Sequence, residues 1–323
     1  MIPRLLKLPR RASILLLGPR GTGKSSLVRD TFQENSKTLW IDLLDHALEE
    51  LYVQNPSRLG EEITAGKYRT VVIDEVQKCP ALLNVAHRFI ESSGVQFVLT
   101  GSSARKLRRG AANLLAGRAF TYQLHPLTHR ELGARFHLQE ALEFGTLPRL
   151  YFPSGATAKR QIKWSAQEKI LFLQSYARTY LKEEIQVEQI VRRVEPFRGF
   201  LRVAAQMNGK VIEYAKIAEE VHVDPKTVAE YFSILEDTLV GFLLHPYHRS
   251  IRKRQGKKPG KPPALVEIKS SESIADSRIS KLSVFKKDFP DSELFILSRE
   301  KRQRIHDGVW IGPWNEGIQR ILG

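Results

Sequence analysis

A glycine-rich segment, "GPRGTGKS", runs from Gly18 to Ser25 and matches the spacing GxxxxGK[ST] in full. Glycines at these positions let backbone N–H groups curl around phosphate oxygens, and a helix that begins there adds partial positive charge. Lys24 is then placed to reach the β- and γ-phosphates of a nucleotide, and the hydroxyl of Ser25 to ligate Mg²⁺. The predicted nucleotide-binding residues are Gly18, Pro19, Arg20, Gly21, Thr22, Gly23, Lys24, Ser25 and Ser26.

Such a loop holds phosphate only between a buried strand and a helix. Residues 14–17 are an unbroken apolar run, as expected of a parallel strand covered on both faces. Leu27, Val28 and Phe32 can form the apolar face of a helix after the loop. Because strand, loop and helix follow in this order, the alternative of a chance glycine-rich turn is disfavoured.

Two acidic residues end a second apolar segment, "TVVIDEVQ". Asp74 is predicted to hold Mg²⁺, largely through its water shell, and Glu75 to polarise the attacking water. Neighbours on a strand point to opposite faces, so the two carboxylates can have different tasks. The alternative is a strand that ends in a solvated Asp-Glu pair.

Two further candidates follow along the chain. Thr100, or else Ser102, lies at the tip of a third apolar strand, "QFVLTGSS", and could sense the γ-phosphate or only cap the next helix. Arg118 precedes a further strand, "FTYQL", and could reach the γ-phosphate of a neighbouring subunit as an arginine finger. The alternative for Arg118 is a surface or core-capping arginine.

The elements that position these residues alternate between strand and helix. With "WIDLLD" over residues 40–45 as another strand, four or five strands alternate with helices, which predicts a doubly wound α/β core. From residue 134 to residue 195 apolar residues recur at helical spacing, which predicts a connector or lid.

Residues 214–246 carry the pattern of a winged helix-turn-helix. Two short helices are expected around a turn at His222 and Val223, with Asp224 capping the second helix. The second helix is predicted to turn Val228, Phe232 and Leu235 inward and Lys226, Thr227 and Tyr231 outward, and the apolar tail from Thr238 suits a β-wing. The helix pair could read DNA or dock a protein, and Arg249, Arg252, Lys253 and Arg254 would contact phosphates without specifying bases.

Glu267 and Lys269 lie two apart on an expected buried strand, "ALVEIKSS", and resemble half of a metal-dependent nuclease site. No Asp or Glu occurs between residues 238 and 266, so a preceding strand cannot supply the second carboxylate. Asp276 or Asp288 could complete the site only by an unusual topology. This end of the chain is therefore predicted to be an inactive nuclease-like remnant behind a basic tether.

Composition limits the class of protein and of partner. Lys and Arg outnumber Asp and Glu by 51 to 35, which favours polyanions, nucleic acid first, over the alternative of solvated surface charge. The single cysteine excludes disulfide frameworks and cysteine zinc sites and fits a cytoplasmic protein. No apolar run reaches the roughly 20 residues that span a bilayer, and the first 13 residues are interpreted as a surface segment.

The motifs "LLLGPRGTGKSS", "VVIDEVQ", "LTGSSARKLRRGAANLLAGRA", "TYLKEEI" and "YFSILEDTLVGFLLHPYHRSIRKR" together resemble prokaryotic AAA+-type ATPases with a C-terminal domain of unknown function. The resemblance covers residues 11–254. It implies an ATPase domain, a helical connector, a winged helix and a domain like the restriction-endonuclease fold. It also implies the roles given above to Lys24, Ser25, Asp74, Glu75, Thr100 and Arg118. The chain departs from the family after Arg254, where the segment with the metal-binding Asp is missing.

The sequence thus predicts an α/β P-loop NTPase of AAA+/ASCE type that binds ATP and Mg²⁺. The expected domains are an ATPase domain (1–133), a connector (134–195), a winged helix (196–250), a basic linker (251–263) and a shortened α/β domain (264–323). The predicted function is ATP hydrolysis coupled to DNA or a protein partner, in a homo-oligomer that does not associate with membranes. The alternative is a slow ATP switch that regulates the winged helix, and a nuclease is disfavoured.

Overall fold

A computed structural model describes residues 2–32, 35–102, 115, 117–153, 163–181, 185, 194–245 and 263–322, except for the side chains of residues 277 and 278. The chain divides into two compact units, Met1–Leu243 and Leu244–Gly323. The predicted phosphate contacts Arg249, Arg252, Lys253 and Arg254, and most of the helix predicted after Ser102, lie outside the described residues. No helix in the described ranges has both the length and the apolar character needed to cross a membrane.

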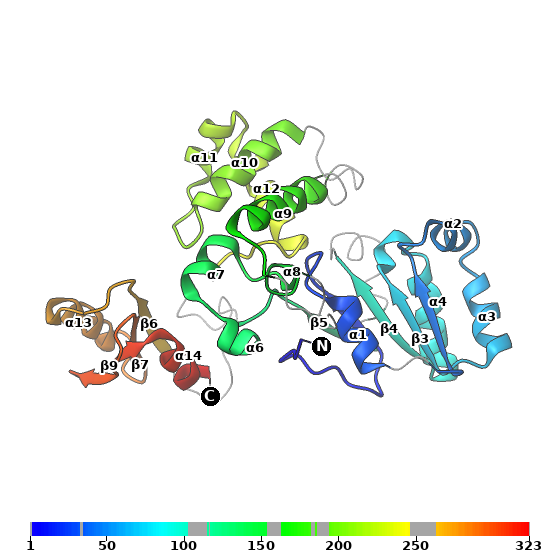
Figure 1. The fold of residues 1–323 in the computed structure, drawn as a ribbon, viewed down its shortest axis with the longest axis horizontal. Helices are drawn as coiled ribbons and strands as arrows, with labels where there is room; N and C mark the ends of the chain where they lie inside the picture. Colours follow the sequence, from blue (N-terminus) through cyan, green and yellow to red (C-terminus); the bar gives the residue numbers. More distant parts are fainter. Residues whose placement is uncertain are drawn as a thin grey trace. The chain divides into compact units, whose positions relative to one another are not determined.

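The first unit is built on a five-stranded parallel sheet in the order β2-β3-β4-β1-β5 (Figure 1). Its strands are β1 (Ile14–Leu17), β2 (Thr38–Asp42), β3 (Thr70–Asp74), β4 (Gln96–Gly101) and β5 (Phe120–Gln123). Strand β4 therefore lies between the strand that leads into the glycine-rich loop and the strand that ends in acids. All five carboxyl ends meet at one edge of the sheet because the strands are parallel.

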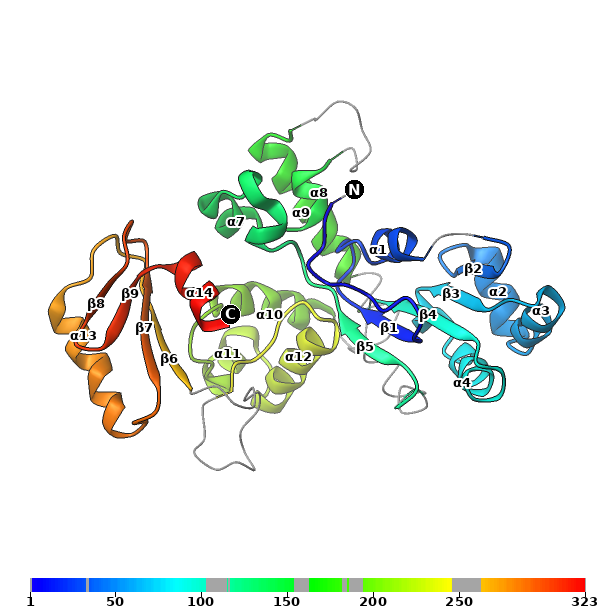
Figure 2. The same ribbon diagram turned by 90° about the horizontal axis from the view of Figure 1, so that it is seen from below.

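Alternating side chains of this sheet pack into two separate cores. Ile14 and Leu16 of β1 pack with Val72 and with Leu27 and Val28 on one face. The opposite face packs against α2 (His46–Gln54), α3 (Arg58–Gly66) and α4 (Leu82–Ser93). In Figure 2, α1 (Lys24–Thr31) and α4 lie on opposite sides of the sheet. Helices therefore cover both faces of the sheet, which confirms the doubly wound prediction. A strand buried on both faces is expected to be apolar at every position.

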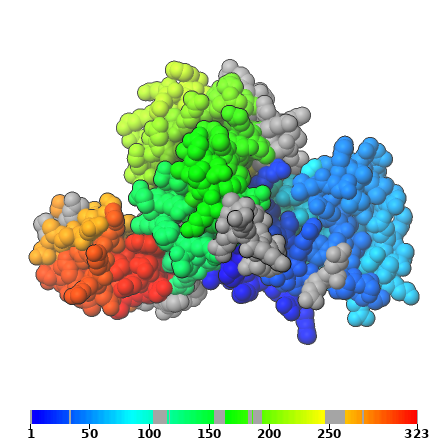
Figure 3. Space-filling model, viewed as in Figure 1, coloured from blue at the N-terminus to red at the C-terminus, as the bar shows by residue number. Residues whose placement is uncertain are grey.

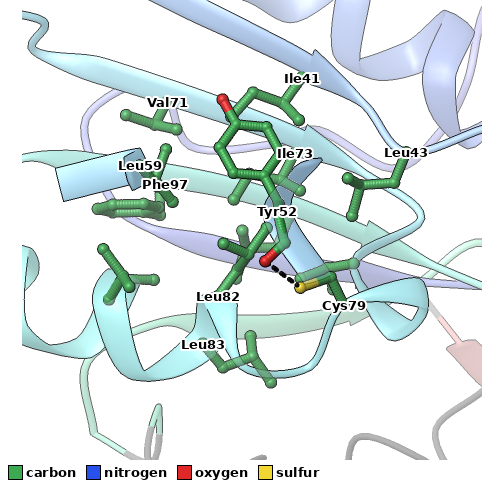
Figure 4. Packing of buried hydrophobic residues seen from close by; sticks show 14 of the residues in the cluster. Ile41, Leu43, Tyr52, Leu59, Val71, Ile73, Cys79, Leu82, Leu83 and Phe97 are labelled. Carbon is green, nitrogen blue, oxygen red and sulfur yellow. Dashed lines mark hydrogen bonds between the residues drawn. The ribbon is translucent and has the colours of Figure 1, made fainter. Parts of the chain in front are cut away.

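The core between the sheet and helices α2 to α4 is dense with aliphatic and aromatic side chains. Figure 4 shows Ile73 and Phe97 of the strands packed with Tyr52, Leu59 and Leu82 of the helices. The only cysteine of the chain is buried in the same cluster, where its thiol donates to a backbone carbonyl. Burial raises the pKa of that thiol, so it remains a packing residue in its protonated form.

Helices follow the sheet, and those after residue 134 lie where the sequence predicts a connector. They are α6 (His129–Leu132), α7 (Leu138–Phe144), α8 (Pro148–Tyr151) and α9 (Ala166–Thr179). Helices α6 and α9 both begin with a capping box, in which Thr128 pairs with Glu131 and Ser165 with Glu168. These boxes fix where each helix starts although neither sequence is strongly amphipathic.

The helix-turn-helix pattern corresponds to α11 (Tyr214–Val221) and α12 (Pro225–Asp237), which pack on α10 (Val194–Gln206). Asp224 caps α12 through the amides of Lys226 and Thr227. Two expectations are wrong. Tyr231 does not face outward: it is 7% exposed and packs on Phe197, because it shares the apolar stripe of its helix. Residues 238–245 form turns and coil instead of the expected strand of a wing.

The second unit is a four-stranded mixed sheet in the order β6-β7-β9-β8. Its elements are β6 (Ala264–Ile268), α13 (Asp276–Ser283), β7 (Glu293–Ser298), β8 (Arg304–His306), β9 (Val309–Pro313) and α14 (Trp314–Leu322). Helices α13 and α14 cover separate apolar clusters, and their residues are coloured orange to red in Figure 3. Strand β6 is not the buried strand that the sequence predicts, because among the described residues it pairs only with β7 and because Ile268 is 74% exposed.

Candidate active site

The glycine-rich loop leaves β1 at the carboxyl edge of the sheet and is held there by backbone contacts. The amide of Gly18 donates to the carbonyl of Gly101 in β4 at 3.2 Å. A Cβ atom at Gly18 would overlap the backbone carbonyl of Leu124, which follows β5. Glycine is therefore required at this position, because the backbone of the loop passes directly against the backbone of Leu124.

Two later glycines of the loop adopt left-handed backbone conformations. Gly21 has φ 78° and Gly23 has φ 91°, values that side-chain-bearing residues rarely adopt. Gly23 precedes α1, and no side chain caps the start of that helix. The first backbone N–H groups of α1 are thus left to bind an anion, as the sequence motif requires.

Lys24 is a cation folded back over its own loop. Its side chain is only 4% exposed, and its Nζ donates to the carbonyl of Gly18 at 2.9 Å. The same Nζ lies 3.7 Å from Oε1 of Glu75. The structure therefore brings together the two residues that the sequence assigns to phosphate binding and to water activation, although they are 51 positions apart.

Asp74, Glu75 and Thr100 form a hydrogen-bonded group where β3 and β4 end. The pairing of Ile73 with Leu99 places Asp74 beside Thr100. The hydroxyl of Thr100 donates to Oδ1 of Asp74 and accepts from the amide of Glu75 at 3.0 Å. Glu75 itself has φ 58°, so the chain turns sharply after Asp74 and sends the two carboxylates in different directions.

A glutamine that the sequence interpretation missed holds the Glu75 carboxylate. Nε2 of Gln77 donates to Oε2 of Glu75 and, at 3.0 Å, to the hydroxyl of Ser102. Its Oε1 atom is buried and finds no hydrogen-bond partner among the residues that the structure describes. The one sequence signal for Gln77 was its position two residues after Glu75.

These residues face a cleft of about 1220 Å³ in the first unit. Its lining includes all predicted nucleotide-binding residues from Arg20 to Ser26, together with Glu75, Gln77 and Ser102. Gly18, Pro19, Asp74 and Thr100 are buried and do not line the cleft. The glycine-rich loop and the Glu75 carboxylate therefore line the same cleft.

Other lining residues come from segments to which the sequence assigned no nucleotide-binding role. Lining residues of the first ten positions include Arg4, Lys7 and Arg10, and those of helices α8 and α9 include Arg149 and Tyr176. Leu8 is buried in the core beside β1, whereas Leu5, Lys7 and Arg10 are exposed, so this segment lies at the surface, as expected, and is anchored by Leu8. The cleft has both apolar and cationic walls, which suits an organic phosphate.

Arg118 does not belong to this group in its own subunit. It precedes β5, whose first residue pairs with Ile14, so it lies at the amino edge of the sheet, away from the loop. Its Nε donates to Oε1 of Glu91 in α4 at 2.7 Å. The Arg118 guanidinium lowers the pKa of Glu91, as an exposed ion pair at this edge does.

Ligands for a transition metal are not found in the described ranges, where no three His, Cys, Asp or Glu side chains lie close enough to hold an ion. Ser25 and Asp74 instead offer a hydroxyl and a carboxylate oxygen. These are the hard donors that Mg²⁺ accepts alongside water and phosphate, so the residues present fit that ion.

The chain was compared with known proteins. Among solved structures, the chain is 15% identical to the ORC2 protein of Aeropyrum pernix in its ADP form, with 69% of this chain and 79% of that chain covered and a TM-score of 0.36. It is 17% identical to C. elegans PCH-2, with 72% and 61% covered and a TM-score of 0.24. A Bacteroides Pif1 helicase with ADP-AlF3 and ssDNA is 12% identical, with 55% of each chain covered and a TM-score of 0.27. A comparison with curated proteins finds no match.

Family models match two consecutive segments. Residues 136–261 match a domain of unknown function, which spans both the predicted connector and the predicted winged helix. Residues 10–133 match the model of an AAA domain and contain the parallel sheet, the glycine-rich loop and the acidic strand end. The first unit of this chain therefore contains an α/β domain that is similar to AAA domains.

Proposed function

We propose that the cleft carries out Mg²⁺-dependent ATP hydrolysis. The observation that carries the proposal is the position of the Glu75 carboxylate, 3.7 Å from the ammonium of Lys24 and lining the same cleft as the glycine-rich loop. A base must lie within one water of the phosphate that the lysine neutralises, and the short distance between Glu75 and Lys24 supports this role for Glu75.

Other residues of the site have binding and orienting roles in this proposal. The backbone of the loop and Lys24 would hold the phosphates, and Ser25 and Asp74 would hold Mg²⁺. When bound, that ion neutralises charge on the phosphate oxygens. Thr100 would keep the Asp74 carboxylate and the Glu75 backbone in place through its two hydrogen bonds. It would thus act by positioning, without touching the nucleotide.

A second subunit would complete the site through Arg118. The residue lies at the amino edge of the sheet, where it cannot serve its own loop but can serve a neighbour's. Its partner Glu91 is half exposed, so this ion pair is weak and can exchange for a phosphate. The proposed assembly is therefore a homo-oligomer in which neighbouring subunits share catalytic residues.

Coupling to a partner is assigned to the helix pair α11 and α12, proposed as a helix-turn-helix between connector and tether. Lys226 and Glu230 are exposed on α12, so the surface has mixed charge. That mixture suits either a DNA backbone contact or protein docking, and the basic segment after it favours DNA. The second unit is proposed as a shortened nuclease-like domain without activity, in which Glu267 and Lys269 pair with each other at 2.5 Å.

The proposal is tested by the rate of ATP hydrolysis with Mg²⁺, with and without single- and double-stranded DNA. Lys24→Ala is the control, and we expect it to abolish nucleotide binding. Fast turnover that DNA stimulates supports a motor, whereas slow turnover indifferent to DNA supports the switch. Equal rates in the wild-type and Lys24→Ala proteins would contradict ATP hydrolysis at this cleft.

A further inference from the structure

Arg4, near the start of the chain, is in contact with the glycine-rich loop. Its Nη1 donates to the carbonyl of Thr22 at 3.0 Å. Its Nη2 donates to the carbonyl of His125 at 2.5 Å, and its Nε to Oε1 of Glu131 at 3.0 Å. One guanidinium thus joins the loop, the segment after β5 and the start of the helical connector.

The guanidinium of Arg4 is held in place by contacts outside the loop. The side chains of Arg4 and Glu131 are 8% and 4% exposed, so the ion pair is nearly dry. Oε1 of Glu131 also accepts from the amide of Leu5, while its Oε2 belongs to the capping box of α6 through Thr128. Burial lowers the pKa of Arg4, and the charge of Glu131 and its hydrogen bond oppose this effect. Because the guanidinium of Arg4 is planar and Glu131 holds its Nε, its Nη1 and Nη2 atoms have little freedom to move.

The carbonyl that Arg4 holds belongs to the peptide plane between Thr22 and Gly23. In a planar trans peptide the carbonyl and the N–H point in opposite directions. Fixing the carbonyl of Thr22 toward Arg4 therefore fixes the N–H of Gly23 away from it. Gly23 has φ 91° and no side chain, so nothing within the residue itself would prevent this plane from rotating.

A second side chain holds the peptide plane between Arg20 and Gly21 in the same way. The hydroxyl of Tyr176, on α9, donates to the carbonyl of Arg20 at 3.0 Å. The following residue, Gly21, has φ 78°, and a Cβ there would lie 3.7 Å from the Tyr176 ring. The connector therefore controls the plane that carries the N–H of Gly21.

We propose that Arg4 and Tyr176 are positioning residues that brace the glycine-rich loop from outside, each by holding the carbonyl before a left-handed glycine. The braces direct the N–H groups of Gly21 and Gly23 toward the phosphates of a bound nucleotide. This inference rests on the proposed ATP site. It adds that the N-terminal segment and the connector, clamped together by Arg4 and Glu131, tune how tightly the loop grips phosphate.

Two conservative substitutions test the braces in the full chain. Arg4→Lys keeps a cation for Glu131 but cannot reach three acceptors at once, and Tyr176→Phe removes one hydroxyl. Arg58→Lys and Tyr52→Phe are matched controls, because both side chains contact Glu62 far from the loop. We expect the affinity for ATP to fall about tenfold in Arg4→Lys and a few-fold in Tyr176→Phe, since one charged and one neutral hydrogen bond are lost.

Hydrogen exchange of the peptide covering residues 18–26, measured without nucleotide, gives an independent readout. We expect faster exchange there in both brace variants, and wild-type exchange in both controls and in the strand peptides. Unchanged loop exchange, or faster exchange with unchanged ATP affinity, would overturn the bracing. A wild-type protein that binds no nucleotide would instead refute the proposed function, while the exchange comparison still decides whether the loop is braced.

Discussion

Replacing Thr100 by Val tests whether its hydroxyl holds the acidic strand end together. Thr100 is fully buried, and valine fills the same volume, so no cavity forms. The change removes a hydrogen bond to the charged Asp74, worth about 1.5–3 kcal/mol, and leaves the amide of Glu75 without its acceptor, at a cost of about 1–3 kcal/mol. We therefore expect a loss of about 3 kcal/mol in the free energy of unfolding.

The assay is urea unfolding followed by circular dichroism, with two comparison variants. Thr100→Ser keeps the hydroxyl and should lose about 1 kcal/mol for one buried methyl group. Thr31→Val removes a hydroxyl that bonds only the carbonyl of Leu27 within α1, and should change stability by about 0.5 kcal/mol or less. We also expect slower ATP hydrolysis in Thr100→Val alone. A Thr100→Val protein that unfolds at the wild-type urea concentration would refute the role given to this hydroxyl.

Three further predictions concern other parts of the first unit. Gly18→Ala should displace the loop, because its Cβ would overlap the carbonyl after β5, and nucleotide titration should show lost binding. The hydroxyl and amide of Thr227 lower the pKa of Asp224, so Asp224 stabilises α12 above about pH 4 and loses this effect as the pH falls through its lowered pKa. The melting temperature of Asp224→Ala should therefore lie below that of the wild type at pH 7, with a smaller gap toward pH 3, and a constant gap would contradict the assignment. Arg118→Ala should bind ATP without hydrolysing it, and mixing it with Lys24→Ala subunits should restore turnover; no recovery would argue against a shared site.

The parallel sheet and the loop could be predicted because their signals are local. An apolar run with no polar residue, such as residues 14–17, has few ways to be buried, and the glycine spacing fixes the turn that follows. Asp74 and Glu75 were found for the same reason, since they end a similar run. That a threonine 26 positions later would bond Asp74 depends on strand register, which the sequence alone does not specify.

Long-range contacts and edge positions account for what the sequence did not predict. The pair of Arg4 and Glu131 spans 127 positions, and no periodicity links its members. Tyr231 was predicted to face outward, although it lies three residues after Val228 and thus on the buried stripe of α12. Strand β6 reads as apolar but lies at a sheet edge, and a strand's place in the sheet is a tertiary property.

The central claim is that Glu75 activates water for ATP hydrolysis in the cleft beside Lys24. The direct measurement is ATP affinity together with the rate of phosphate release for Glu75→Gln, compared with the wild-type protein. We predict an affinity within a few-fold of wild type and a turnover rate lower by about 10²–10⁴, because the amide cannot accept the proton. Turnover by Glu75→Gln at the wild-type rate would contradict the account.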